Sequence, residues 1–189
     1  MNEFNIEKIA NAIIFFIDRD VKHLGKTKFI KIMFIADKIH LEKYGRTIFE
    51  DTYYKTSNTI IPLKTFNIIN DFIENAITKN SKTDILIKKF SALISMQYKY
   101  DKQCKQAITF TKKIDFNKNI FSKSELQILK LIAEQYRKTS SEEINNTIKN
   151  MEEFKNTPDY NIIEEVSMTE NNKDYVSYWK KEISELSKI

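Results

Sequence analysis

The sequence has few of the residues that usually shape loops or build reactive sites. Its 189 residues include two glycines, two prolines, one cysteine and two histidines. Gly25 and Gly45 are too few and too far apart for a glycine-rich phosphate loop, which disfavours the common nucleotide-binding turns. Cys104 alone gives no disulfide framework, and with only His23 and His40 beside it a standard Cys/His zinc site is not expected. A site made of carboxylates alone stays open.

Long hydrophobic runs are also missing. No apolar stretch approaches the roughly 20 residues that span a bilayer. Residues 1–20, MNEFNIEKIANAIIFFIDRD, have no basic start and no small-residue cleavage site, so they predict an amphipathic helix and not a signal peptide. Hydrophobic residues make up 41% and charged residues 30% of the chain, as in a soluble globular protein. We therefore expect one cytoplasmic domain over residues 1–189, without a membrane segment and without a cofactor.

The net charge of +5 raises the question of a nucleic-acid partner. Lysine supplies nearly all of it and is spread evenly among acids, because only Arg19, Arg46 and Arg137 are arginines. Lysine, asparagine and isoleucine are all abundant, as in proteins from A+T-rich genomes. Codon bias therefore explains the basic charge about as well as nucleic-acid binding does, and the charge alone does not decide between them.

The hydrophobic pattern is mostly helical. It predicts a first helix over about residues 5–19, a second that begins near an N-cap at Thr27 and ends at Gly45, and a third after Pro62 that breaks at residues 79–83. Between residues 94 and 110 the apolar residues alternate, which predicts a small antiparallel hairpin. Four later helix starts are indicated by Ser122 with Glu125, by Ser140 with Glu143, by Thr157 with Pro158 and by a final apolar stripe from about Asn172. The predicted fold class is thus mainly α, a compact helical domain with a small antiparallel β insert.

Chemically suggestive side chains gather in one stretch, FIADKIHLEKYGRTIFEDTYY, residues 34–54. Asp37 and His40 lie three apart on a helix, so their side chains can meet. That pair has the composition of a base and its orienting group, but the same residues also suit a helix end that packs against its neighbour. Arg46 and Asp51 flank a short segment that a charge-assisted hydrogen bond between them would brace. The tyrosines here, Tyr44, Tyr53 and Tyr54, suit either a partner surface or the edge of the core.

The stretch KFIKIMFIADKIHLEKYGRTIFEDTYY, residues 28–54, resembles the signature of the SocA-like Panacea antitoxin family, which is related to the prophage protein GepA. The matching pattern is a helix with lysine and apolar residues, then aromatic-x-Ala-Asp, His-Leu, Tyr-Gly-Arg, an acidic turn and Tyr. FSKSELQILKLIAEQYRKTSSEEI, residues 121–144, matches the family more weakly through its two capped helices. The positions that carry the stronger match are Lys28, Lys31, Phe34, Ala36, Asp37, His40, Leu41, Tyr44, Gly45, Arg46, Ile48, Asp51 and Tyr53.

The resemblance implies an antitoxin of a bacterial or phage toxin–antitoxin system, a cytoplasmic protein that neutralises a separately encoded toxin by binding it. One branch of the family acts as an adaptor that delivers its toxin to a protease. The family needs no catalytic residue, so we expect neither an enzyme nor a metal. A nucleic-acid-binding protein or a phage-encoded interaction protein is the alternative. Asp37, His40, Tyr44, Gly45, Arg46 and Asp51 are then expected to form a structural corner.

The segment after the corner departs from the family. The family usually has a Gly-Pro-Val-Pro element here, whereas this chain reads TIIP at residues 59–62. An exposed loop with aromatic anchors and apolar residues suits a partner. We therefore expect the toxin contact in the loop from Tyr53 to Pro62, through Tyr53, Tyr54, Asn58, Ile60 and Ile61.

Overall fold

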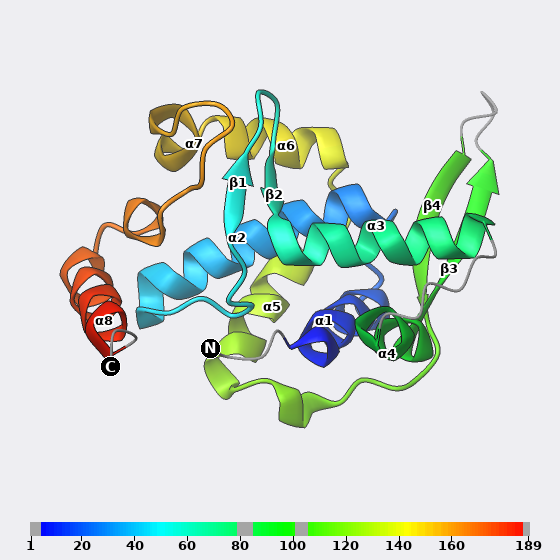
Figure 1. Cartoon of the computed structure of the whole chain (residues 1–189). Coiled ribbons are helices and arrows are strands. Elements are labelled where there is room, and N and C mark those ends of the chain that lie inside the picture. Colours follow the sequence, from blue (N-terminus) through cyan, green and yellow to red (C-terminus); the bar gives the residue numbers. More distant parts are fainter. Residues whose placement is uncertain (1–4, 79–84, 101–105, 187–189) are drawn as a thin grey trace.

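The structure is a computed structural model, which describes residues 5–78, 85–100 and 106–186. Helices dominate the described chain, and two small two-stranded antiparallel sheets accompany them (Figure 1). The predicted fold class is confirmed. The elements are α1 (Ile6–Asp18), α2 (Lys26–Tyr44), β1 (Tyr53–Lys55), β2 (Ile60–Pro62), α3 (Leu63–Thr78), α4 (Ile85–Leu93), β3 (Ile94–Tyr100), β4 (Gln106–Lys112), η1 (Lys118–Ile120), α5 (Lys123–Gln135), α6 (Ser141–Lys149), α7 (Glu152–Asn156), η2 (Glu165–Met168) and α8 (Lys173–Leu186).

Helix α2 runs through the middle of the fold (Figure 1). Every residue from Lys28 to Asp37 is buried, so these turns of the helix are covered on all sides. A helix that is buried all round is expected at the centre of a domain. The elements that contact it include α3, α5, α6, β2, β4 and η2.

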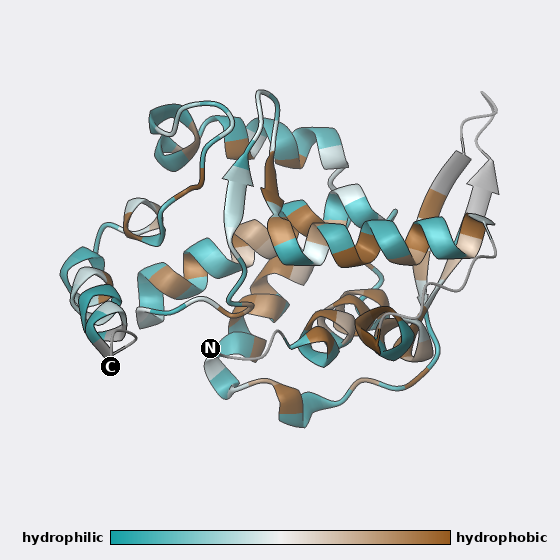
Figure 2. Cartoon of the chain, viewed as in Figure 1, coloured by the Kyte–Doolittle hydropathy of each residue, from teal (hydrophilic) through white to brown (hydrophobic). Residues whose placement is uncertain are grey.

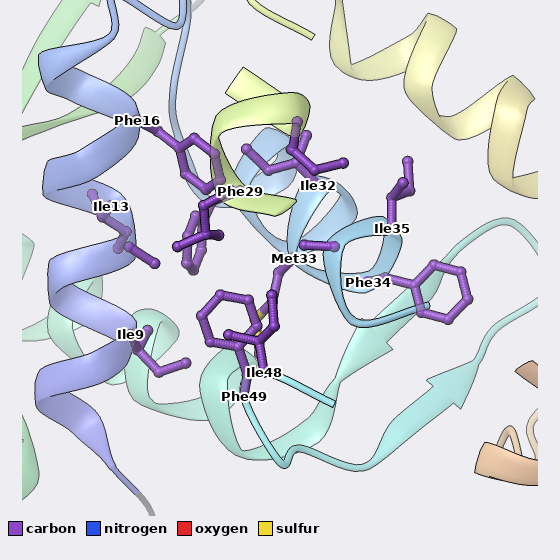
Figure 3. Close-up of a cluster of buried hydrophobic side chains, with 14 of the residues drawn as sticks. Ile9, Ile13, Phe16, Phe29, Ile32, Met33, Phe34, Ile35, Ile48 and Phe49 are labelled. Atoms are coloured by element: carbon purple, nitrogen blue, oxygen red, sulfur yellow. The ribbon is translucent and has the colours of Figure 1, made fainter. Parts of the chain in front are cut away.

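The core lies between α2 and α1 and extends toward α5 (Figure 3). Two isoleucines and Phe16 of α1 face Phe29 and Met33 of α2, and Ile48 and Phe49 reach in from the segment that follows α2 (Figure 3). Hydrophobic residues are most frequent on α1 and α4 and alternate with hydrophilic ones on α2, whereas α8 is mostly hydrophilic or neutral on the hydropathy scale (Figure 2). The segment after α2 is therefore anchored in the core by apolar side chains.

Several predicted helix ends are confirmed. Asn5 caps α1 by accepting the Lys8 N–H, and Gly45 ends α2 in the left-handed conformation. The capping boxes at Ser122 and Ser140 are both formed. Thr27 is not the N-cap of α2, because the helix already begins at Lys26 after Gly25.

The predicted hairpin is present as β3 and β4, which pair from Ile94 opposite Lys112 onward. The hydroxyl groups of Ser95 and Thr111 lie 2.7 Å apart across the pair. On its other edge β4 is tied to the segment that precedes α2, since the Phe110 N–H donates to the Leu24 carbonyl. Cys104 and the helix break predicted at residues 79–83 lie outside the described residues.

Residues 53–62 form a second hairpin, β1–β2, where the sequence predicted a loop. The chain between α7 and η2 joins its open side, because the Ile163 N–H donates to the Tyr53 carbonyl at 2.8 Å and the Lys55 N–H to the Asn161 carbonyl at 2.9 Å. The helix predicted to begin at Thr157 and Pro158 is therefore wrong. Thr157 instead ends α7, and the chain after it runs alongside β1.

Candidate functional site

The candidate site is the segment of residues 45–52 between α2 and β1, called the corner below. It begins at Gly45, whose φ of 72° is left-handed and whose N–H donates to the Leu41 carbonyl. Only glycine adopts this conformation without steric cost. The ring of Tyr175 from α8 also lies against this residue, 2.7 Å from where a Cβ atom would be. Gly45 is thus required twice, for its backbone angle and for the close approach of Tyr175.

Asp37 holds the middle of the corner from inside the fold. Its carboxylate accepts the N–H groups of Ile48 at 2.7 Å and Phe49 at 3.1 Å, and the hydroxyl of Tyr53 at 2.7 Å. Burial raises the pKa of Asp37 to about 7, against these three donors, which lower it. Burial and the neighbouring Asp37 charge likewise raise the pKa of the Tyr53 hydroxyl. This fully buried carboxylate therefore has the role of a backbone anchor.

His40 holds the start of the corner. Its Nδ1 lies 2.7 Å from the Arg46 carbonyl and its Nε2 lies 3.1 Å from the hydroxyl of Ser124 on α5. A carbonyl oxygen only accepts, so Nδ1 carries the proton and a neutral ring accepts the Ser124 hydroxyl at Nε2. Burial lowers the pKa of His40, which favours that neutral form. Both ring nitrogens are engaged in holding the corner to its surroundings.

None of the hydrogen bonds of Asp37 and His40 described above joins the two side chains, although the sequence suggested that they could meet. Asp37 bonds to Ile48, Phe49 and Tyr53, whereas His40 bonds to Arg46 and Ser124. The two side chains fix successive parts of the same segment. This arrangement supports the structural interpretation of the pair over the base and orienting-group interpretation.

Arg46 has a different partner from the one predicted. Its guanidinium lies 2.7 Å from the Glu125 carboxylate on α5 and 3.3 Å from the Ser122 hydroxyl. Glu125 also accepts the ammonium of Lys8 at 2.8 Å, so one buried acid joins α1, the corner and α5. Burial acts to raise the pKa of Glu125, but Lys8, the Ser122 N–H and Arg46 together bring it below its ordinary value.

Asp51, the predicted partner of Arg46, starts α3 instead. Its two carboxylate oxygens accept the N–H groups of Lys64 at 3.1 Å and Thr65 at 2.8 Å, and also that of Thr52 at 2.8 Å. The first N–H groups of a helix have no partner within it, and a carboxylate stabilises them. The predicted Arg46–Asp51 brace is therefore corrected to two separate attachments, one to α5 and one to α3.

Tyr44 stands on the outer side of the corner. Its side chain is exposed, its hydroxyl donates to Gln127 at 3.2 Å, and its ring centroid lies 4.8 Å from that of His40. Its ring therefore packs beside His40 while the residue stays 44% exposed.

A protein-family model matches the part of the sequence that forms most of this site. The model for the antitoxin SocA-like Panacea domain matches residues 29–155, which include most of α2, the whole corner, β1–β2, α5 and α6. This chain belongs to the SocA-like Panacea family. No curated protein and no solved structure matches the chain significantly.

The β1–β2 hairpin lies within the Panacea match, and its two faces divide the five residues predicted to contact a partner into buried and accessible ones. Tyr53 and Ile60 are buried, at 2% and 0% exposure, so the expectation that both lie on an exposed loop is wrong. Tyr54 and Ile61 alternate with them and are only partly covered. Asn58, at the exposed turn, accepts the Asn145 amide through its carbonyl and the Lys149 ammonium through its side chain. The alternation is what a strand with one buried face requires.

The outer face of the β1–β2 hairpin carries a row of three apolar side chains. Tyr54 is directly opposite Ile61 of β2 on one side and Ile162 on the other. Residues directly opposite each other in antiparallel strands point to the same face, so Ile61, Tyr54 and Ile162 lie side by side. Ile162 is 50% exposed. We call these residues the outer row.

Two parts of the arrangement were missed in the sequence. The sequence predicts Glu125 only as the capping-box partner of Ser122, and its second role as partner of Lys8 and Arg46 has no local signal, because those residues lie 117 and 79 positions away. The approach of Tyr175 to Gly45 is equally long-range. Among the residues that the structure describes, there is no group of three His, Cys, Asp or Glu side chains suited to a metal ion. Within the same ranges, no helix has the length and hydropathy needed to cross a membrane.

Proposed function

We propose that this protein is an antitoxin that neutralises a protein toxin in the bacterial cytoplasm by binding it directly. The observation that carries the proposal is the Panacea match over residues 29–155. The geometry of the corner supports it, since Asp37, His40, Arg46 and Asp51 are all used in internal bonds that make a rigid frame. A rigid frame suits a binding protein, because little conformational entropy is then lost on association.

The outer row is the proposed contact surface of the hairpin. It keeps Tyr54 and Ile61 from the predicted set, adds Ile162, and lies beside Asn58 at the turn. Tyrosine and apolar side chains at the centre of a patch usually provide most of the binding free energy. Tyr53 and Ile60 support the row from inside and are not proposed to contact the toxin themselves.

Binding has two possible consequences for the toxin. The antitoxin either keeps the toxin bound and inactive, or it delivers the toxin to a protease as an adaptor. Both require the same direct contact, so the first experiment tests contact and neutralisation. The proposed toxin is the protein encoded by the adjacent reading frame.

Co-expression in a bacterial host tests the proposal. The wild-type chain should restore growth to cells that express the neighbouring protein, and Tyr54→Ala combined with Ile61→Asp should not. Lys89→Ala on α4 is the matched control, because Lys89 is exposed and lies away from the hairpin. Lys149 would be a poor control, since it bonds to Asn58.

The outcomes test the antitoxin function and the choice of contact surface separately. A neighbouring protein that is toxic but is not neutralised by the wild-type chain contradicts the antitoxin proposal. A folded double variant that restores growth as well as Lys89→Ala shows that the outer row is not the contact surface. Toxin levels measured by immunoblot in the same cells distinguish sequestration, in which the toxin persists, from delivery to a protease, in which it is lost.

A further inference from the structure

The chain after the Panacea match carries an unusual share of exposed large hydrophobic residues. The family match ends at residue 155, and the structure describes the following residues up to 186. Of the ten large hydrophobic side chains that are exposed in the described chain, five lie in this short segment. They are Tyr160, Ile162, Tyr175, Tyr178 and Trp179. Aromatic residues exposed together in this way are typical of a protein contact surface.

Three of these residues form one aromatic cluster on α8. The ring centroid of Trp179 lies 6.2 Å from that of Tyr175 and 5.5 Å from that of Tyr178, both in edge-on geometry. Such pairs stabilise one another beyond the area they bury. Trp179, in the centre, is still 47% exposed. The cluster therefore holds its tryptophan in a defined position while one side stays open.

A cleft of about 350 Å³ is lined by residues of both this cluster and the corner. One wall consists of Tyr175, Trp179 and Lys180 on α8, and the opposite wall includes Gly45, Arg46 and Thr47. This volume is at the small end of binding sites in proteins and suits a side chain better than a large ligand.

The cleft is held open by attachments at the start of α8. The carboxylate of Glu42 on α2 accepts the N–H groups of Glu170 at 2.8 Å and Asn171 at 3.3 Å. The side-chain amide of Asn172 donates to the Leu41 carbonyl at 3.0 Å and to the Glu42 carbonyl at 2.6 Å. Val176 is buried one turn later. These contacts fix α8 to the end of α2, so the cleft exists before any partner binds.

The charges around the cleft favour a protein over a nucleic acid. Both cations in the lining already face a carboxylate at 2.7 Å, Arg46 that of Glu125 and Lys180 that of Glu164. Two acids, Glu50 and Glu165, line the same cleft. Nucleic acid is bound through cations that are available to phosphates, which this lining does not offer. An aromatic centre with a rim of both charges is instead the composition of a protein interface.

We infer that this cleft is a second contact site for the toxin, at which an apolar side chain of the toxin inserts beside Trp179. The inference rests on the proposed antitoxin function and adds a contact to the outer row. The toxin then contacts two parts of the chain: the β1–β2 hairpin, within the family match, and the aromatic cluster on α8, which follows it. Trp179 is the anchor of the second part, and Tyr175 and Tyr178 hold it in place.

The composition of the chain provides a direct probe, because Trp179 is its only tryptophan. The chain is labelled with 5-fluorotryptophan, and its single ¹⁹F resonance is recorded while the unlabelled protein of the adjacent reading frame is added. Formation of the complex is followed independently by size-exclusion chromatography. We expect the resonance to shift or be replaced at the same stoichiometry at which the complex forms, and solvent-induced isotope shifts to show that the ring loses exposure to water.

Variants test whether the contact matters for binding. Trp179→Ala and Tyr178→Ala should each weaken binding about tenfold or more, as at a central aromatic anchor, while Lys89→Ala leaves it unchanged. Thermal unfolding shows whether each variant is folded, and Tyr178, which is 57% exposed, provides the less disruptive change.

The outcomes distinguish this inference from the proposed function. A stoichiometric complex with an unchanged ¹⁹F resonance and full affinity of the Tyr178→Ala variant overturns the cleft as a contact site and leaves the antitoxin proposal standing. A response of the resonance to duplex DNA and not to the neighbouring protein overturns the choice of a protein occupant. Absence of both a complex and neutralisation contradicts the proposed function and the inference together.

Discussion

The guanidinium of Arg46 lies 2.7 Å from the buried carboxylate of Glu125, and this pair joins the corner after α2 to the first turn of α5. The partners are unequal, because the side chain of Glu125 is 3% exposed and that of Arg46 is 49% exposed. Glu125 also pairs with Lys8 and forms the capping box of its own helix with Ser122. The acid is therefore the centre of the arrangement, and the arginine is one of its several attachments.

The first prediction concerns the unequal cost of removing these partners. Glu125→Ala should lower the free energy of unfolding by about 3 kcal/mol, because it removes the acid half of the capping box and leaves two cations without their acid. Arg46→Ala should cost only about 1 kcal/mol, since its charge is half exposed and Lys8 still pairs with Glu125. Urea unfolding of both variants measures the difference. Equal losses would contradict the central role of the acid in this arrangement.

The second prediction concerns Gly45 and Tyr175. Gly45→Ala should cost about 1–2 kcal/mol for the left-handed backbone, and more because the new Cβ would lie 2.7 Å from the Tyr175 ring. In a Tyr175→Ala background only the backbone cost should remain. A double-mutant cycle by thermal or urea unfolding measures the coupling. Strictly additive effects would contradict the close approach of α8 to the corner.

The third prediction concerns pH and Asp37. Burial raises its pKa to about 7 in the folded protein from the ordinary value of 3.8, so between these values the folded state binds more protons than the unfolded state. The contribution of Asp37 to the free energy of unfolding should therefore fall as pH rises through this window, by up to about 1.4 kcal/mol per unit. The groups around it are Tyr53, the N–H groups of Ile48 and Phe49, and the Asp51 charge.

Asp37→Asn provides the control for that slope. The pKa of His40 is lowered by burial, so its own contribution rises with pH below its ordinary value of 6.5 and opposes that of Asp37. The difference between wild type and variant cancels the His40 contribution. Urea unfolding from pH 5 to 7.5 should show wild type losing stability relative to Asp37→Asn as pH increases. Parallel profiles would mean that Asp37 keeps an ordinary pKa in the folded state.

The fourth prediction concerns the alternation in β2. Ile60→Ala should lower the free energy of unfolding by about 2–4 kcal/mol, because Ile60 is fully buried. Ile61→Ala should cost less than about 1 kcal/mol, since Ile61 lies on the outer face. Binding to the toxin should respond in the opposite order when the Ile60 variant is measured in its folded state. A larger stability loss at Ile61 would contradict the strand register.

The sequence predicted those features whose causes are local. Helix ends at Asn5, Gly45, Ser122 and Ser140 depend on caps within three or four residues, and the structure confirms them. Thr157 with Pro158 has the same local pattern, yet no helix begins there. The chain after Thr157 runs beside β1 instead, and its hydrogen bonds go to Tyr53 and Lys55, which no local pattern encodes.

The position of the candidate site in the chain could be predicted from the sequence, but the bonding partners of its residues could not. Asp37, His40 and Arg46 were identified as a corner, and they do hold it, but Arg46 and Asp51 bond to different helices from each other. Strands β1 and β2 are three residues each and are joined by a turn without glycine or proline, which gives too short a pattern to predict a hairpin. Burial of Tyr53 and Ile60 follows only once that hairpin is known.

The measurement that tests the central claim most directly is isothermal titration calorimetry of the purified chain with the purified product of the adjacent reading frame. Direct neutralisation predicts a saturable complex of fixed whole-number stoichiometry with a Kd of about 1 μM or below, weakened by Tyr54→Ala with Ile61→Asp and unaffected by Lys89→Ala. If the purified proteins do not bind although co-expression protects growth, neutralisation by direct contact is contradicted.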